Sequence, residues 1–111
     1  MRALIIPADG SARFEDIDAE LETLQRLVDG HIEAVPARFG ANMYLNEEGK
    51  LAGLPLNLAA TSAVDERVSA SDVIVGPAVI LGGVDEMGGD TGLDDEQAAQ
   101  FTRLLGLRGA A

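Results

Sequence analysis

The stretch Asp72-Val73-Ile74-Val75-Gly76-Pro77-Ala78-Val79-Ile80-Leu81 carries the strongest strand signal in the sequence. Nearly all of its side chains are apolar and many are β-branched, which is typical of a strand in a protein core. Pro77 has no backbone N–H and cannot donate a ladder hydrogen bond, so we expect a bend or bulge at Gly76-Pro77. The run therefore predicts either two core strands or one long strand that changes direction.

Two regions upstream predict further strands of the same sheet. Residues 3–6 form a short apolar run before Pro7 and the turn pair Asp9-Gly10, and residues 12–17 are expected to pair back on it. Residues 31–35 alternate between polar and apolar side chains and precede a proline, which indicates a half-buried strand.

A second hairpin is predicted after that strand. The alternating run Met43-Tyr44-Leu45 is followed by the polar stretch Asn46-Glu47-Glu48-Gly49 and then by Lys50-Leu51-Ala52-Gly53-Leu54. Asn and Gly tolerate the positive φ angles of tight turns, so the polar stretch suits the turn of a hairpin. The alternative is a recognition loop on a rigid sheet, with Tyr44 and Asn57 as its polar contributors.

Two amphipathic helices are predicted where apolar side chains recur at three- and four-residue steps. The first covers residues 18–29, with Asp18 as its N-terminal cap. The second covers residues 94–105 and begins with Asp94 and Gln97 at the spacing of a capping box. A shorter helix over residues 58–64 is expected to follow Asn57 as its cap.

These elements predict an α+β fold in which a small, mostly antiparallel sheet packs against two amphipathic helices. The chain has 111 residues, of which 47% are hydrophobic, so it has enough apolar side chains to bury a core. We expect a single globular domain over residues 1–111.

The charge and the rare residue types restrict the function. There are 8 Lys and Arg residues against 19 Asp and Glu residues, which gives a net charge of −11 at pH 7. Such a charge disfavours direct binding to nucleic-acid phosphates. The absence of Cys and the presence of one His leave little material for thiolate or imidazole chemistry. No apolar run reaches the roughly 18 residues of a membrane-spanning helix, and we expect a cytoplasmic protein.

The largest electrostatic feature is an acidic segment, residues 85–96, that contains no Lys or Arg. Its six carboxylates are Asp85, Glu86, Asp90, Asp94, Asp95 and Glu96. A twelve-residue calcium loop is a poor match, because Met87 and Gly89 stand where oxygen ligands are required. A hard-cation site of another kind stays a minor alternative, and the two main interpretations are a solvated loop before an acidic helix start and a surface that recognises a basic patch on a partner protein.

Catalytic chemistry has little support in the sequence. His31 and Glu33 share one face of the strand predicted there, but no nucleophile or third partner accompanies them. We therefore assign no catalytic residue, no metal ligand and no cofactor.

Several motifs carry a resemblance to a known family. They are Asn46-Glu47-Glu48-Gly49-Lys50-Leu51, Gly53-Leu54-Pro55-Leu56-Asn57 and Ser71-Asp72-Val73-Ile74-Val75-Gly76. The sequence resembles a domain-of-unknown-function family of short proteins that occur in phages, plasmids and the bacteria that carry them. In that family Arg or Glu frequently follows the residue that Asn57 matches, whereas Leu58 follows it here. The resemblance implies a mobile-element setting and brings no catalytic residue with it.

The function that we expect is a small acidic protein-binding module, an accessory protein of phage or mobile-element origin that modulates a host protein. Its partner is expected to have a basic surface, and the binding residues are the six acidic side chains together with Tyr44 and Asn57. The alternatives are an enzyme that uses carboxylates and a metal at the glycine-rich acidic loop, and an inhibitor that mimics DNA. A structural or oligomer-forming subunit, with residues 72–81 on an open sheet edge, is a further class, and the sequence leaves the oligomeric state open.

Overall fold

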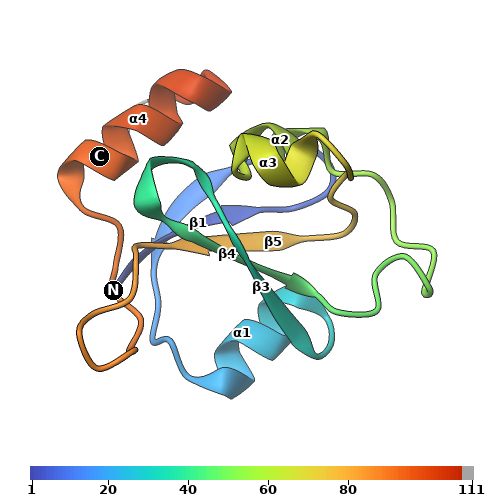
Figure 1. Ribbon diagram of the computed structural model, residues 1–111, viewed down its shortest axis with the longest axis horizontal. Helices are drawn as coiled ribbons and strands as arrows, with labels where there is room; N and C mark the ends of the chain where they lie inside the picture. The colour runs from blue at the N-terminus through green and yellow to red at the C-terminus, as the bar shows by residue number, and fades with distance from the viewer. Residues whose placement is uncertain (109–111) are drawn as a thin grey trace.

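A five-stranded antiparallel sheet runs through the molecule in the order β2-β1-β5-β4-β3 (Figure 1). The computed structural model of the protein describes residues 1–108. The strands are β1 (Arg2–Ile6), β2 (Arg13–Asp16), β3 (Ile32–Pro36), β4 (Asn42–Asn46) and β5 (Ala78–Leu81). This sheet with its packed helices confirms the predicted α+β fold.

The central strand β5 comes from the apolar run that dominates the sequence. All four of its residues are buried, and it pairs with β1 on one side and with β4 on the other. The bend expected at Gly76-Pro77 is present, since Gly76 has a φ of +75°. Residues before the bend leave the sheet, where Val75 forms an isolated bridge with Leu56. The prediction that residues 72–81 could lie on an open edge is therefore wrong.

Helices cover both faces of the sheet (Figure 1). Helix α1 (Leu21–Val28) lies on one face, and α2 (Leu58–Ala63), α3 (Glu66–Ser69) and α4 (Asp95–Leu105) lie on the other. Alternation along the strands supplies a core to each face, so the structure has three layers. The α1 core contains Ala3, Ile5, Leu24, Val28, Val79 and Leu81. The larger core contains, among others, Leu4, Ile6, Met43, Val64, Ile80 and Phe101.

The two amphipathic helices differ in how closely their ends follow the prediction. Asp94 and Gln97 form the expected capping box of α4, with a distance of 2.7 Å from Gln97 N to Asp94 Oδ1. Helix α1 instead begins at Leu21, after the predicted cap, and the Asp18 carboxylate accepts hydrogen bonds from Glu20 N ahead of the helix and from Thr23 Oγ1 in its first turn. The Thr23 hydroxyl and then the Glu20 amide lower the pKa of that carboxylate.

The hairpin predicted for residues 43–54 is wrong. Strand β4 pairs with β3 and β5, so no side of it is free for a returning strand, and residues 47–53 form a series of turns. The actual hairpin joins β3 to β4 through the short 3₁₀ turn Arg38–Gly40. Phe39 and Gly40 have φ angles of +63° and +73°, which are typical of the two central residues of a type I′ turn.

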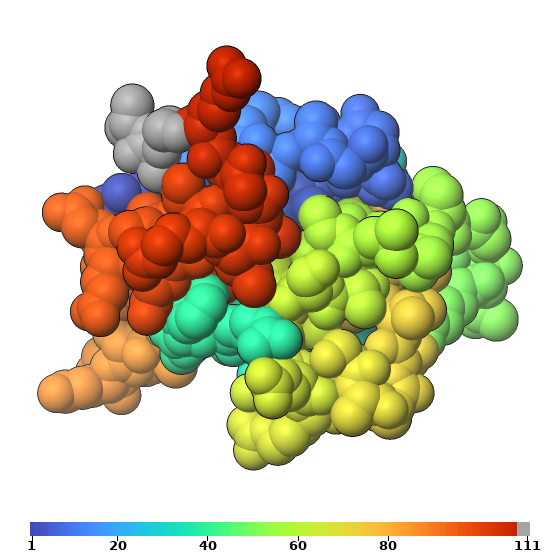
Figure 2. Space-filling view, turned by 90° about the horizontal axis from the view of Figure 1, so that it is seen from above, coloured from blue at the N-terminus to red at the C-terminus, as the bar shows by residue number. Residues whose placement is uncertain are grey.

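The β3–β4 turn lies between α4 and the α2–α3 segment in the space-filling view (Figure 2). The Phe39 ring packs edge-to-face on Phe101 of α4, with 4.9 Å between ring centroids. None of the helices in residues 1–108 has the length and apolar character needed to cross a membrane.

Candidate functional site

The acidic segment begins with a tight, hydrogen-bonded turn. Asp85 N donates to Gly89 O over 2.8 Å, and the Asp85 carboxylate accepts from the backbone N–H groups of Met87 and Gly89. Val84 and Asp90 form a bridge that closes the turn. Asp85 therefore has a structural part in shaping this loop.

Asp90 and Tyr44, two of the predicted binding residues, lie together. The Tyr44 hydroxyl donates a hydrogen bond to Asp90 Oδ1 and so joins β4 to the loop after β5. Desolvation, followed by the hydrogen bond and the negative charge of Asp90, raises the pKa of Tyr44 to about 12. The phenol therefore remains a neutral hydrogen-bond donor at physiological pH.

Three of the remaining acidic side chains lie at the start of α4, and Glu86 lies in the turn that Asp85 shapes. Asp94 caps this helix, and Asp95 forms an ion pair with Arg2 at 2.6 Å while its side chain stays almost fully exposed. Glu86 and Glu96 are exposed and make no side-chain hydrogen bond or ion pair within residues 1–108. Across the same residues, no three His, Asp or Glu side chains are grouped so that they could hold a metal ion.

Asn57 lies in the interior, so the prediction that it contributes to an exposed binding surface is wrong. Its side chain is completely buried and accepts a hydrogen bond from Ala60 N at the start of α2. The same amide donates to Ile6 O over 2.9 Å and to Gly76 O over 2.8 Å. Asn57 thus connects α2, β1 and the bend before β5, and these contacts explain an Asn at this position.

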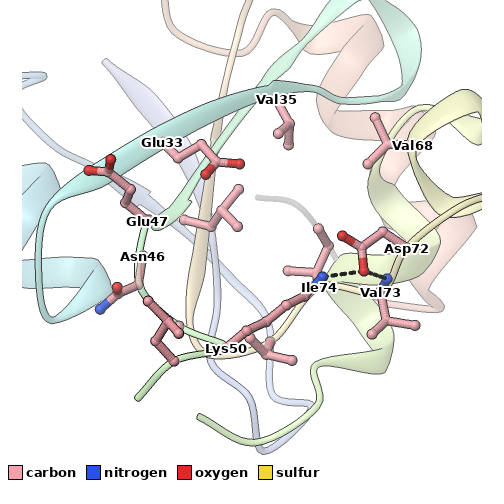
Figure 3. A pocket seen from close by; sticks show the side chains of 13 residues that line it. Glu33, Val35, Asn46, Glu47, Lys50, Val68, Asp72, Val73 and Ile74 are labelled. Atoms are coloured by element: carbon pink, nitrogen blue, oxygen red, sulfur yellow. Dashed lines mark hydrogen bonds and ion pairs between the residues drawn. The ribbon is translucent and has the colours of Figure 1, made fainter. Parts of the chain in front are cut away.

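A pocket of about 220 Å³ lies between β3, the turns after β4 and the segment after α3 (Figure 3). We call it the β3 pocket. Its apolar lining consists mainly of Val35, Leu45, Val68, Ile74 and Val75. The pocket opens on the sheet face that carries α2 and α3, because Val35 and Leu45 pack with the core of that face. Its volume is below the roughly 300–1,000 Å³ of sites for drug-sized molecules, so one long side chain is a better fit.

The rim of the β3 pocket is acidic. It carries three carboxylates, Glu33, Glu47 and Asp72, against the single ammonium group of Lys50. Lys50 and Asp72 form an ion pair and a hydrogen bond with each other. This hydrogen bond and then the N–H of Val73 hold the pKa of Asp72 below its usual value.

Glu33 and Glu47 therefore supply the uncompensated charge of the rim. Both residues are exposed, and within the described part of the chain neither side chain has a hydrogen bond or ion pair. Figure 3 shows both on the β3 and β4 side of the pocket, opposite Asp72. A cation at this side of the rim would meet negative charge that no cation of the described residues pairs.

Two apolar side chains are exposed at the same pocket. Leu51 is 90% exposed and Val73 is 45% exposed, and both contribute to the lining. Exposed apolar side chains beside a pocket with a polar rim are characteristic of protein-interaction sites. The arrangement can hold the aliphatic stem of a Lys or Arg side chain on an apolar floor and its charged end at the rim.

Sequence reasoning found only part of this pocket. The motif that begins at Asn46 has a recognition loop as one of its interpretations, and its residues Asn46, Glu47, Gly49, Lys50 and Leu51 do line the pocket. Asn46 itself serves the fold, because its amide donates to Val28 O at the end of α1. The sequence did not indicate that the four charged side chains of the rim form one site, namely Glu33, Glu47, Lys50 and Asp72. Lys50 and its ion-pair partner Asp72 are 22 positions apart, and no periodic pattern in the sequence links these four positions.

A family model matches nearly the whole chain. Residues 1–106 match the family described as "Domain of unknown function (DUF3846)". No curated protein and no solved structure matches the chain.

Proposed function

The chain belongs to the family of the domain of unknown function DUF3846, and we propose that it is a small protein-binding module for a partner with a basic surface. The observation that carries this proposal is the β3 pocket, in which an apolar floor is combined with two unpaired carboxylates. A Lys or Arg side chain of the partner satisfies both features, because its stem is apolar and its end is cationic.

The acidic segment adds long-range attraction to the same kind of partner. Its six carboxylates have one paired cation, Arg2, within the described residues, and the whole chain carries a net charge of −11. Exposed charges of one sign raise the rate of encounter with an oppositely charged protein, over a range of about 8 Å at physiological salt. In this proposal the acidic segment steers the partner and the β3 pocket holds it.

We propose the setting of the interaction from the resemblance of the sequence. The resemblance to short phage and plasmid proteins supports a partner among the proteins of a host cell, whose activity the bound module modulates. Electrostatic recognition suits such a task, since complementary charge gives fast association and selects against acidic competitors.

The test compares two charge-reversed variants in a capture experiment. The Glu33→Lys/Glu47→Lys variant removes the acidic rim of the pocket, and the Glu20→Lys/Glu22→Lys variant changes net charge equally at the exposed start of α1. Each immobilised protein is exposed to host lysate at low and at high salt, and captured proteins are quantified by mass spectrometry. We expect a stoichiometric partner that the parent and the α1 variant retain and the pocket variant loses.

Two results would contradict the proposal. If both variants lose the partner alike, only the overall charge matters and the pocket has no special part. If the pocket variant captures the partner as well as the parent does, recognition takes place elsewhere.

A further inference from the structure

Strand β3 is the last strand of its side of the sheet, and part of its outer edge is open. Glu47 N donates to His31 O and Ala37 N donates to Ala41 O, so odd-numbered residues of this stretch exchange hydrogen bonds with β4. Bonding alternates along an antiparallel pair, and therefore Ile32 and Ala34 direct their backbone N–H and C=O groups away from the sheet.

One end of this edge is already occupied by the chain itself. Ala37 forms an antiparallel bridge with Val64, and Asp65 N donates to Pro36 O over 3.0 Å. Pro36 has no N–H of its own to leave unpaired. The covered end shows that an antiparallel segment fits against β3, and the open part is the stretch that contains Ile32 and Ala34.

We infer that the basic partner binds as an extended segment that pairs antiparallel with Ile32 and Ala34 and places a Lys or Arg side chain in the β3 pocket. This inference rests on the proposed function and specifies how the partner is held. Backbone hydrogen bonds to an open strand provide affinity, and alternate side chains provide specificity.

The pocket lies on the correct face for such a segment. Glu33 and Val35 direct their side chains to the pocket, whereas Ile32 packs toward the α1 core. Residues directly opposite each other in an antiparallel pair have their side chains on the same face. Alternate residues of an added strand would therefore lie beside Glu33 and Val35, and a Lys or Arg among them reaches the acidic rim.

Charge also distinguishes this partner from a second copy of the chain. Two β3 strands paired about a two-fold axis would bring the Glu33 side chains of both copies to the same junction, between two molecules of net charge −11. Like charges across a strand pair are destabilising. An extended basic segment has the opposite charge and suits the edge better.

The test uses a short synthetic peptide that alternates Thr and Lys, together with two N-methylated forms. In the inferred complex the Thr residues lie opposite Ile32 and Ala34 and donate their N–H groups to β3, while the Lys N–H groups point outward. N-methylation of the Thr residues is expected to weaken binding by about tenfold or more, because it removes donors to two carbonyl groups. N-methylation of the Lys residues is the matched control and is expected to leave the affinity nearly unchanged.

Binding is measured by calorimetry, and backbone amide exchange of Ile32 and Ala34 is followed by NMR. Slower exchange at these two amides, with the expected order of affinities, supports strand addition. If both methylated peptides bind as well as the parent peptide but Glu33→Lys/Glu47→Lys abolishes binding, strand addition is wrong and the proposed function stands.

Three other results would overturn the inference. The first is a larger loss of affinity when the Lys residues are methylated, and the second is no binding of the parent peptide. The third is a dimer of the protein whose formation protects the same amides, which would assign the edge to a second copy. The lysate capture experiment decides the proposed function independently of all three.

Discussion

The Tyr44 hydroxyl donates a hydrogen bond to Asp90 across 46 positions of the chain. It connects the middle of β4 to the turn that follows β5, on the face of the sheet where Tyr44 packs beside the α1 core. Both residues were expected in a binding surface, and the structure gives each of them a partner within the fold.

Tyr44 is expected to ionise only in strongly alkaline solution. Because the chain contains one Tyr and no Trp, the ultraviolet absorbance of the phenolate reports on this side chain alone. The titration of the folded protein should have its midpoint near pH 12, where desolvation and Asp90 place the pKa. In Asp90→Asn the midpoint should be lower, and a midpoint near the ordinary value in the parent would contradict the hydrogen bond.

The raised pKa of Tyr44 also predicts how stability depends on pH. The pKa is higher in the folded chain, about 12, than the ordinary value of 10.0 for tyrosine, so the folded state binds the proton more tightly. This contribution to stability is fully present below about pH 10 and is lost as the pH rises toward 12. Urea unfolding of the parent and of Tyr44→Phe between about pH 10 and pH 12 measures this contribution. The free energy of unfolding of the variant should fall less over this range than that of the parent.

Asn57→Ala is expected to be among the most damaging single substitutions. It removes the cap of α2 and leaves the buried carbonyls of Ile6 and Gly76 without their donor. We expect a loss of about 2–5 kcal/mol in the free energy of unfolding. Asn57→Asp keeps the cap acceptor but not the donors, and it should not rescue stability. A loss below about 1 kcal/mol for the Ala variant would show that these bonds matter little.

Phe101→Ala is expected to test the packing of α4. The ring is fully buried in the larger core, and its removal should cost roughly 3–5 kcal/mol, from lost burial and the cavity left behind. Leu58→Ala is the matched control, because Leu58 is 70% exposed and should be nearly neutral. Chemical denaturation gives both values, and equal stability of the two variants would disprove the docking of α4.

Two substitutions of Phe39 measure how much its positive φ angle lowers the free energy of unfolding. Phe39→Ala and Phe39→Gly both remove the ring that packs on Phe101, but only Gly adopts a φ of +63° without a steric penalty. The Ala variant should therefore be less stable than the Gly variant by about 1 kcal/mol. The opposite order, measured by urea unfolding, would mean that the turn relaxes when the ring is removed.

Local sequence signals predicted the elements that depend on local chemistry. The capping box of Asp94 and Gln97, the cap of α2 by Asn57 and the bend at Gly76-Pro77 were all predicted from neighbouring residues. Each depends on contacts within a few positions, and such contacts leave a readable pattern in the sequence.

The β3–β4 hairpin was missed because its turn has an uncommon residue. Phe39-Gly40 occupies the two central positions, where Asn-Gly is the usual signal, and the ring is held there by Phe101 from a distant helix. The stretch that begins at Asn46 has typical turn residues and was assigned the hairpin instead. The pairing partners of β4 depend on the packing of all strands in the sheet, and local strand propensity does not determine them.

The candidate site was predictable only in its charge. Net acidity and the acidic segment can be counted from the sequence, and they indicated a basic partner. The β3 pocket depends on bringing Glu33, Glu47 and Asp72 together from three segments of the chain. That proximity follows from the strand order and from the turn series after β4, neither of which was predicted.

The strand order also determines the sequence of events by which the sheet can be completed. Strands β1 and β2 form one local hairpin and β3 and β4 form another, and β5 joins the two. Leu4 and Ile80 are partners in the β1–β5 pair, although most of the chain separates them in the sequence. This contact therefore forms only after the last strand has been synthesised. Until then β1 and β4 each expose an apolar edge, and the nascent chain is at its most aggregation-prone. Insertion of β5 is thus the step expected to limit the folding rate, because it closes the longest loops.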